Sequence, residues 1–217
     1  MALRLDALSA PARQLFEALQ GAAIWDEFYL AGGTGLALQI GHRLSADFAF
    51  FSATNPLGAR QREVIRRLLA PFAPVEVEAE EDGTLRLALG DVPISFFRYE
   101  YPLVAPLVEH DRVRLASPLD IGLMKLGAVV GRGRKKDFFD LYFLSGEGLS
   151  LEAILVAAPR KFSGVRDFPV QAIRALVYFE DAEDEETPRL LRPADWQAVK
   201  RYFSEEVSRI SRQWFGA

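Results

Sequence analysis

A glycine turn and, thirteen residues later, an aspartate occur early in this chain, and the glycine turn suits the binding of a phosphate. Gly32-Gly33-Thr34 follows a short apolar run at residues 28–31, and Asp47 comes after the next apolar segment. A strand that leads into a glycine turn lets the backbone approach a phosphate, and the helix after it presents free amides. Glycine more often serves backbone geometry alone. The alternative is therefore an ordinary tight turn, in which Thr34 caps the helix instead of touching a phosphate.

Asp47 begins a segment that is otherwise made of phenylalanine and alanine. Because side chains alternate along a strand, Asp47 and Ala49 should share one face with Phe51. A carboxylate there is costly to bury unless a partner or a cation compensates it. We therefore expect either a cation at Asp47 or an ion pair with Arg43 or Lys125.

A second group of charged residues lies between positions 120 and 140. Lys125 is on a predicted helix at 118–130, beside an apolar stripe formed by Leu119, Leu123, Leu126 and Val130. A lysine in this position either extends its stem along apolar surface or keeps its charge for a phosphate.

The segment after this helix is strongly basic. Arg132, Arg134, Lys135 and Lys136 follow one another closely, and Asp137 and Asp140 then share one face of a helix predicted at 135–144. A basic run of this length is equally typical of a solvated loop and of a contact with phosphate or RNA.

Composition excludes several kinds of site. The 217 residues contain no cysteine and two histidines, which rules out thiolate zinc sites and an imidazole cage. A metal would have to be held by oxygen, which points to Mg²⁺ or Mn²⁺. The chain has no Walker phosphate loop, no dinucleotide fingerprint and no convincing catalytic triad. Without an apparent signal peptide or a long apolar run, we expect a cytoplasmic protein with no membrane contact.

The predicted elements change character along the chain. Helices are expected at 10–20, 35–40 and 56–69, strands at 28–31, 47–51, 75–80, 85–89 and 92–97, and further helices from 118 onward. The acidic stretch at 180–186 is expected to be a solvated loop. This order predicts an α+β fold, a mixed sheet flanked by helices, with residues 1–115 forming one domain and 116–217 a helical one.

Taken together, these segments resemble the AbiEii/AbiGii toxin family of nucleotidyltransferases. The resemblance covers most of the chain and rests on residues 30–48, Ile94-Ser95-Phe96-Phe97, Tyr101-Pro102-Leu103, residues 115–121, Met124-Lys125-Leu126, Arg132, Lys136-Asp137, Asp140-Leu141-Tyr142, residues 176–179 and Trp196.

The resemblance implies a polymerase-beta-like nucleotidyltransferase fold and a bacterial toxin with a cognate antitoxin. Its substrate would be a nucleoside triphosphate, and its acceptor RNA, such as tRNA, or protein. Carried over to this chain, Asp47 would bind the metal, and Lys125 and Asp137 would complete the catalytic residues. Nucleotide binding would fall to Gly32, Gly33, Thr34, Arg43, Lys125, Arg132 and Lys136.

One departure from the family pattern concerns the metal. The family has a second aspartate two positions after the first, and here that position is Ala49. A third carboxylate often comes from a later strand, where this chain has Ser95. Two-metal transfer needs such carboxylates. The alternative function is therefore a catalytically degenerate member that binds a nucleotide or a partner.

Overall fold

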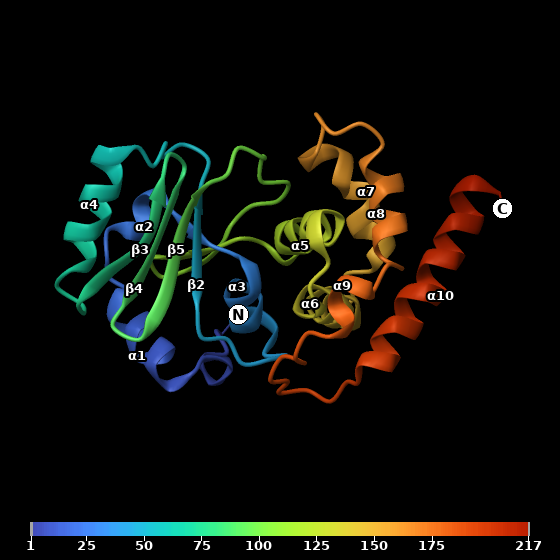
Figure 1. Cartoon of the computed structure of the whole chain (residues 1–217), viewed down its shortest axis with the longest axis horizontal. Coiled ribbons are helices and arrows are strands. Elements are labelled where there is room, and N and C mark those ends of the chain that lie inside the picture. The colour runs from blue at the N-terminus through green and yellow to red at the C-terminus, as the bar shows by residue number, and fades with distance from the viewer. Residues whose placement is uncertain (1, 217) are drawn as a thin grey trace.

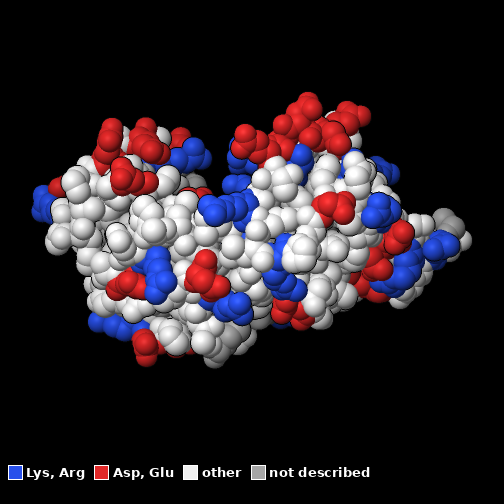
Figure 2. Space-filling view, turned by 90° about the horizontal axis from the view of Figure 1, so that it is seen from below, with Lys and Arg blue, Asp and Glu red and all other residues white. Residues whose placement is uncertain are grey.

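The chain folds into two lobes that lie side by side (Figure 1), and the computed structural model describes residues 2–216. The first lobe carries a sheet flanked by helices, and the second is built of helices alone. Figure 2 shows a hollow between the two lobes on one face, with basic side chains around it and acidic side chains along one edge of each lobe.

Within residues 2–216 the sheet has seven strands, in the order β3-β4-β5-β2-β1-β7-β6. They are β1 (Tyr29–Leu30), β2 (Phe48–Ser52), β3 (Val75–Glu81), β4 (Thr84–Leu89), β5 (Val92–Arg98), β6 (Val108–His110) and β7 (Val113–Leu115). The pairs β2–β5 and β1–β7 are parallel and the others antiparallel, so the sheet is mixed, as predicted. The strand that follows Asp47 lies at its centre.

The helices of the sheet lobe are η1 (Leu5–Ala7), α1 (Ala10–Leu19), α2 (Ile24–Glu27), α3 (Gly32–Ile40) and α4 (Ala59–Leu69). Those of the second lobe are α5 (Pro118–Arg132), α6 (Lys135–Gly146), α7 (Leu151–Lys161), α8 (Phe168–Ala175), α9 (Glu180–Glu183) and α10 (Trp196–Phe215).

Serine caps start several of these helices. The side chains of Ser9, Ser117 and Ser150 accept hydrogen bonds from backbone amides in the first turns of α1, α5 and α7. Each cap satisfies an amide that has no partner within the helix. The predicted helix starts at Ser9 and at Ser117-Pro118 are thereby confirmed.

Some predicted boundaries were wrong. The sequence predicts a last helix that starts at Pro193, but α10 begins after a cap at Asp195. Helix α4 begins at Ala59, not at Pro56. Val64, which we expected on the buried face of α4, is 54% exposed. The short strands β6 and β7 were not predicted at all.

Each lobe is stabilised by its own apolar core, and a smaller cluster joins the two lobes. One core joins the sheet to α1, α2 and α4, and the other fills the space between α5, α6, α7, α8 and α10. The smaller cluster is formed by Tyr29, Ala31, Leu36, Ala116, Ile121 and Leu144, which come from both lobes. The sheet ends at Leu115 and α5 begins at Pro118, but the division into two domains stays a prediction.

Across residues 2–216, no single helix has the length and apolar character needed to cross a membrane. The pair α6 and α7, bent by 113°, meets that criterion only when the two are taken together, by length and composition alone.

Candidate functional site

The two glycines after β1 lie in the first turn of α3, three residues earlier than the predicted start of that helix. Gly32 has φ of +65°, a left-handed conformation that favours glycine. A Cβ atom at Gly33 would lie 1.9 Å from Nη2 of Arg43. The guanidinium of Arg43 therefore needs the space that the missing side chain of Gly33 leaves.

We expect Gly33→Ala to lower the free energy of unfolding by about 1–3 kcal/mol, the usual cost of overpacking a fixed site. The guanidinium cannot swing away freely, because Asp140 holds it. Urea denaturation measures the effect. Gly131→Ala in α5 is the control, because a Cβ there meets nothing within 4 Å. Equal stability of Gly33→Ala and the wild type would contradict this packing.

Thr34 and Ser45 hold the loop that leads to Asp47. Thr34 is 2% exposed, its Oγ1 lies 2.7 Å from Oγ of Ser45, and it also donates to the carbonyl oxygen of Asp47. The N-cap of α3 is Ala31, so Thr34 does not cap the helix as one alternative had it. Its hydroxyl fixes the backbone next to the candidate metal ligand.

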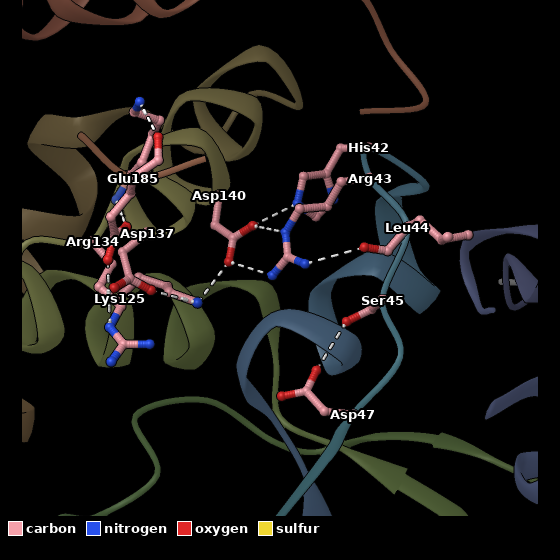
Figure 3. A network of polar contacts seen from close by, with 11 residues as sticks. His42, Arg43, Leu44, Ser45, Asp47, Lys125, Arg134, Asp137, Asp140 and Glu185 are labelled. Atoms are coloured by element: carbon pink, nitrogen blue, oxygen red, sulfur yellow. Dashed lines mark hydrogen bonds and ion pairs between the residues drawn. The ribbon is translucent and has the colours of Figure 1, made fainter. Parts of the chain in front are cut away.

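Asp47 is exposed and comes one residue before β2, so the expected strand start was one residue too early. Ser45 Oγ donates to its carboxylate at 3.4 Å. The expected ion pair with Arg43 or Lys125 was wrong, because both cations bind Asp140 instead (Figure 3). Asp47 lies on the sheet side of the site, apart from the residues around Asp140.

Asp140 is the centre of a buried ionic group, which we call the Asp140 cluster. Its members are His42, Arg43, Lys125, Asp137 and Asp140, all buried. Asp140 Oδ1 accepts from Nε2 of His42 and from Nε of Arg43, each at 2.7 Å. Its Oδ2 lies 3.2 Å from Nη2 of Arg43 and 2.6 Å from Nζ of Lys125. Lys125 Nζ also donates to Oδ1 of Asp137 at 2.7 Å.

The Asp140 cluster joins the lobes. His42 and Arg43 lie between α3 and β2, whereas Lys125 is on α5 and the two aspartates are on α6. From the sequence, Lys136 can pair with Asp140 across one turn of the helix, but Asp140 binds Arg43 and Lys125 instead. For His42, which lies in a turn, the sequence favours a hydrogen-bonding residue over a catalytic base. The structure confirms that hydrogen bond and shows Asp140 to be its partner.

Burial and neighbouring charges shift the pKa values of the cluster's residues in opposite directions. Burial alone would raise the pKa of Asp140, but Lys125 and Arg43 outweigh it and hold that pKa well below its usual range. Burial alone would lower the pKa of Lys125, but Asp140 and Asp137 raise it above its usual value. Burial lowers the pKa of His42, so its ring is neutral and Nε2 carries the proton that Asp140 accepts. Its Nδ1 is buried and has no hydrogen-bond partner among residues 2–216.

The neutral histidine makes stability depend on pH. The unfolded chain protonates His42 near its usual pKa of 6.5, and the folded chain does so only at lower pH. As pH falls below about 6.5 the unfolded state binds more protons, so stability must fall, with a slope of up to about 1.4 kcal/mol per pH unit. The lowered pKa of Asp140 acts in the same direction at more acid pH.

We expect His42→Gln, which keeps a donor for Asp140, to flatten the decrease in unfolding free energy between pH 7 and pH 5.5. Urea denaturation at intervals of pH measures the slope. The chain's other histidine supplies the matched control His110→Gln. Identical slopes in the wild type and His42→Gln would show that His42 does not carry the effect.

A cleft of about 510 Å³ lies between the lobes. Three of the predicted site residues, Gly32, Lys125 and Asp137, line it. The rest of its wall is apolar or aromatic, and comprises Phe51, Tyr99, Tyr101, Met124, Gly127, Ala128, Val130, Gly131, Phe162, Val165 and Phe168. The other predicted site residues are not among those that line it, namely Gly33, Thr34, Arg43, Asp47, Arg132 and Lys136.

The basic segment near position 134 is partly neutralised. The backbone amide of Lys135 donates to Glu185 at 2.8 Å, and Lys135 Nζ donates to the carbonyl of Glu183 at 3.0 Å. Arg134 also pairs with Glu185 at 3.7 Å. The acidic stretch is therefore tied to α6 and contains the short helix α9, so the prediction of a loop was wrong. The prediction that it is solvated is confirmed, because most of its acidic side chains are exposed. Arg132 and Lys136 have no ion pair within residues 2–216.

The residues of the sheet face do not fit a two-metal site. Asp47 is a carboxylate, but Ala49 is not, and Ser95 is paired in register with Ala49 on the parallel neighbour β5. In the part of the chain that the structure describes, no three His, Asp or Glu side chains are placed to hold a metal ion together. Mg²⁺ in phosphoryl-transfer sites relies on carboxylates as well as substrate phosphates. Among its described residues Asp47, Ala49 and Ser95, this face of the sheet offers one carboxylate, that of Asp47.

The sequence matches known proteins along most of its length. The family model of the nucleotidyl transferase AbiEii toxin, of type IV toxin–antitoxin systems, matches residues 13–215. The uncharacterised protein aq_aa25 of Aquifex aeolicus is 36% identical over 198 residues, covering 90% of this chain and 93% of its own.

Two solved structures show the same fold. One is a candidate nucleotidyltransferase of Helicobacter pylori, with a TM-score of 0.57, 19% identity, and coverage of 94% of this chain and 96% of its own. The other is the nucleotidyltransferase toxin MenT4 of Mycobacterium tuberculosis, with a TM-score of 0.57, 14% identity, and coverage of 94% and 86%.

A mixed sheet with a glycine turn after β1, next to its central strand, and a helical lobe across a cleft define a protein of the nucleotidyltransferase fold. The chain belongs to the AbiEii nucleotidyl transferase toxin family. The predicted family and fold class are confirmed.

Proposed function

We propose that the cleft between the lobes binds a nucleoside triphosphate with its phosphates toward Gly32 and Lys125. The observation that carries this proposal is the meeting of the glycine turn, Lys125 and Asp137 in one cleft. Lys125 has three N–H donors and uses two for Asp137 and Asp140. The third is available to a phosphate oxygen. Gly33 and Arg132 or Lys136 would act around the same phosphates.

We further propose that this chain binds the triphosphate without efficient transfer. Positions 49 and 95 carry alanine and serine, so Asp47 is the carboxylate that this face of the sheet retains. Holding two metal ions requires more than one carboxylate. The same loss removes negative charge that would repel a triphosphate when no metal is present. Nucleotide binding should therefore not require a divalent cation.

The second candidate function is active transfer from a triphosphate to RNA, such as tRNA, or to protein, with Mg²⁺ or Mn²⁺. The exposed Asp47 favours it, because its carboxylate makes no ion pair within the described residues. Asp137 would then have to assist from α6. In both candidates the protein would act in the cytoplasm and be controlled by the antitoxin that its family implies.

Calorimetric titration of ATP with magnesium or with EDTA, together with a label-transfer assay, tests the proposal. Equal affinity in both buffers, with no label transferred to RNA or protein from any of the four triphosphates, is the expected result. Transfer that Asp47→Ala abolishes would establish the second candidate instead. No binding in either buffer would overturn the proposed nucleotide site.

A further inference from the structure

One wall of the cleft is a continuous row of aromatic rings. Phe51 and Tyr99 have ring centres 5.5 Å apart, Tyr99 and Tyr101 are 5.3 Å apart, and Tyr101 and Phe162 are 5.0 Å apart. Tyr101 is 40% exposed, so the row is open to a ligand. Each ring offers a face or an edge to a flat aromatic partner.

Another part of the wall is made by a face of α5 that carries Met124 and three small residues. Met124, Gly127, Ala128 and Gly131 line the cleft at spacings of three and four residues, which places them on one side of α5. A Cβ at Gly131 would meet nothing within 4 Å. Phe162 closes the cleft against α5, because a Cβ at Gly127 would lie 3.2 Å from its ring. The remaining space, lined by Phe51, Tyr99 and Tyr101 and by Met124, Ala128 and Gly131, forms a slot that suits a flat ring.

The loop that carries the tyrosines is held firmly. Lys161 is 0% exposed, and its Nζ donates to the carbonyl of Pro102 at 2.9 Å and to Oδ1 of Asp120 at 2.8 Å. The same carboxylate accepts the backbone amides of Val104 and Ala105. Lys161 also lies over the ring of Tyr99, 5.3 Å from its centre. A platform fixed before binding loses little conformational entropy when a ligand stacks on it.

The lining gives little means of telling one base from another. It contains no Asn, Gln, Ser, Thr or His within the described residues, and its charged members, Lys125 and Asp137, pair with each other. The tyrosine hydroxyls are its only neutral polar side-chain groups. Stacking tolerates any base, because every base has a π-face.

We infer that this slot takes the nucleobase of the bound triphosphate by stacking, with little selection among the four bases. The inference rests on the proposed triphosphate site and adds the part of the ligand that the phosphate contacts do not hold. Base stacking on aromatic side chains contributes about 1–3 kcal/mol. ATP should therefore bind at least about fivefold more tightly than inorganic tripolyphosphate.

The test compares ATP and tripolyphosphate on variants that close or strip the slot. Ala128→Leu fills it from α5, and Ala153→Leu, at an exposed position on α7, is the matched control. Tyr101→Ala removes the most open ring and leaves the cores intact. By calorimetry, we expect each slot variant to weaken ATP binding about fivefold or more and tripolyphosphate binding less than about twofold. The control should bind both ligands as the wild type does.

The outcomes separate the two claims. If the wild type binds neither ligand, the triphosphate site itself is refuted and the base slot with it. If it binds both, and the slot variants bind ATP as well as the wild type does, only the base slot is refuted. A difference above about a hundredfold among ATP, GTP, CTP and UTP would overturn the lack of selection, since stacking alone does not supply it.

Discussion

Asp140→Asn should lower the free energy of unfolding by about 3–5 kcal/mol, the cost of leaving buried charges without their partner. The side chain is 0% exposed and binds one histidine and two cations. Asparagine has almost the same shape, but its amide turns a donor toward groups that already donate. Arg43 and Lys125 would then share Asp137 as their nearby carboxylate.

Urea denaturation at pH 7.5 measures this loss. Asp181→Asn is the matched control, because Asp181 is exposed on α9 and the same change there should cost less than about 0.5 kcal/mol. If Asp140→Asn proves too unstable to fold, Arg43→Lys keeps the charge and loses the two-pronged contact with Asp140, so a smaller fall is expected. A loss below about 1 kcal/mol in Asp140→Asn would contradict the role of the cluster.

The position of the Asp140 cluster explains why this residue matters beyond stability. It binds Arg43, whose guanidinium packs on Gly33, and Lys125, which lines the cleft. A single carboxylate thus sets the distance between the glycine turn of one lobe and the lysine of the other. Its pairing with His42 and Arg43 spans 98 and 97 positions of the chain.

Contacts between such distant positions could not be predicted from the sequence, whereas local patterns could. The alternation in residues 48–51 predicted which face of β2 carries Ala49, and Ser9 and Ser117 predicted helix starts, because strand period and caps are local. The partner of Arg43 is not local. Asp47 was the nearer carboxylate in sequence, yet Asp140 binds the guanidinium, because the packing of α6 against α3 brings it there.

The charge pattern after Phe179 predicted a loop where the chain forms the short helix α9. The acidic residues after Phe179 indicated a solvated loop, since like charges repel. The structure compensates them with Lys135, Arg134 and Lys200, which come from α6, the segment before it and α10. Strands β6 and β7 were missed for a different reason. Each has three residues, too few for an alternating pattern to stand out.

The departure at position 49 leads to the prediction with the greatest bearing on function. Ala49→Asp should make ATP binding depend on magnesium, with at least about tenfold tighter binding in magnesium than in EDTA. The new carboxylate would lie on the face of β2 that carries Ala49, opposite Gly32, whose missing side chain leaves room for it. A divalent cation in contact with a carboxylate near a protein surface gains several kcal/mol before desolvation is counted.

The added charge should also act without metal. In EDTA it repels the triphosphate, so Ala49→Asp should bind ATP more weakly than the wild type does, and magnesium should reverse the difference. Ala79→Asp, which adds the same charge at an exposed position on β3, should behave as the wild type does in both buffers. A wild type that already binds ATP only with magnesium would show that Asp47 suffices. If neither protein responds to magnesium, the face of β2 is not where a metal would meet the nucleotide, and the loss at position 49 would not explain a lack of transfer.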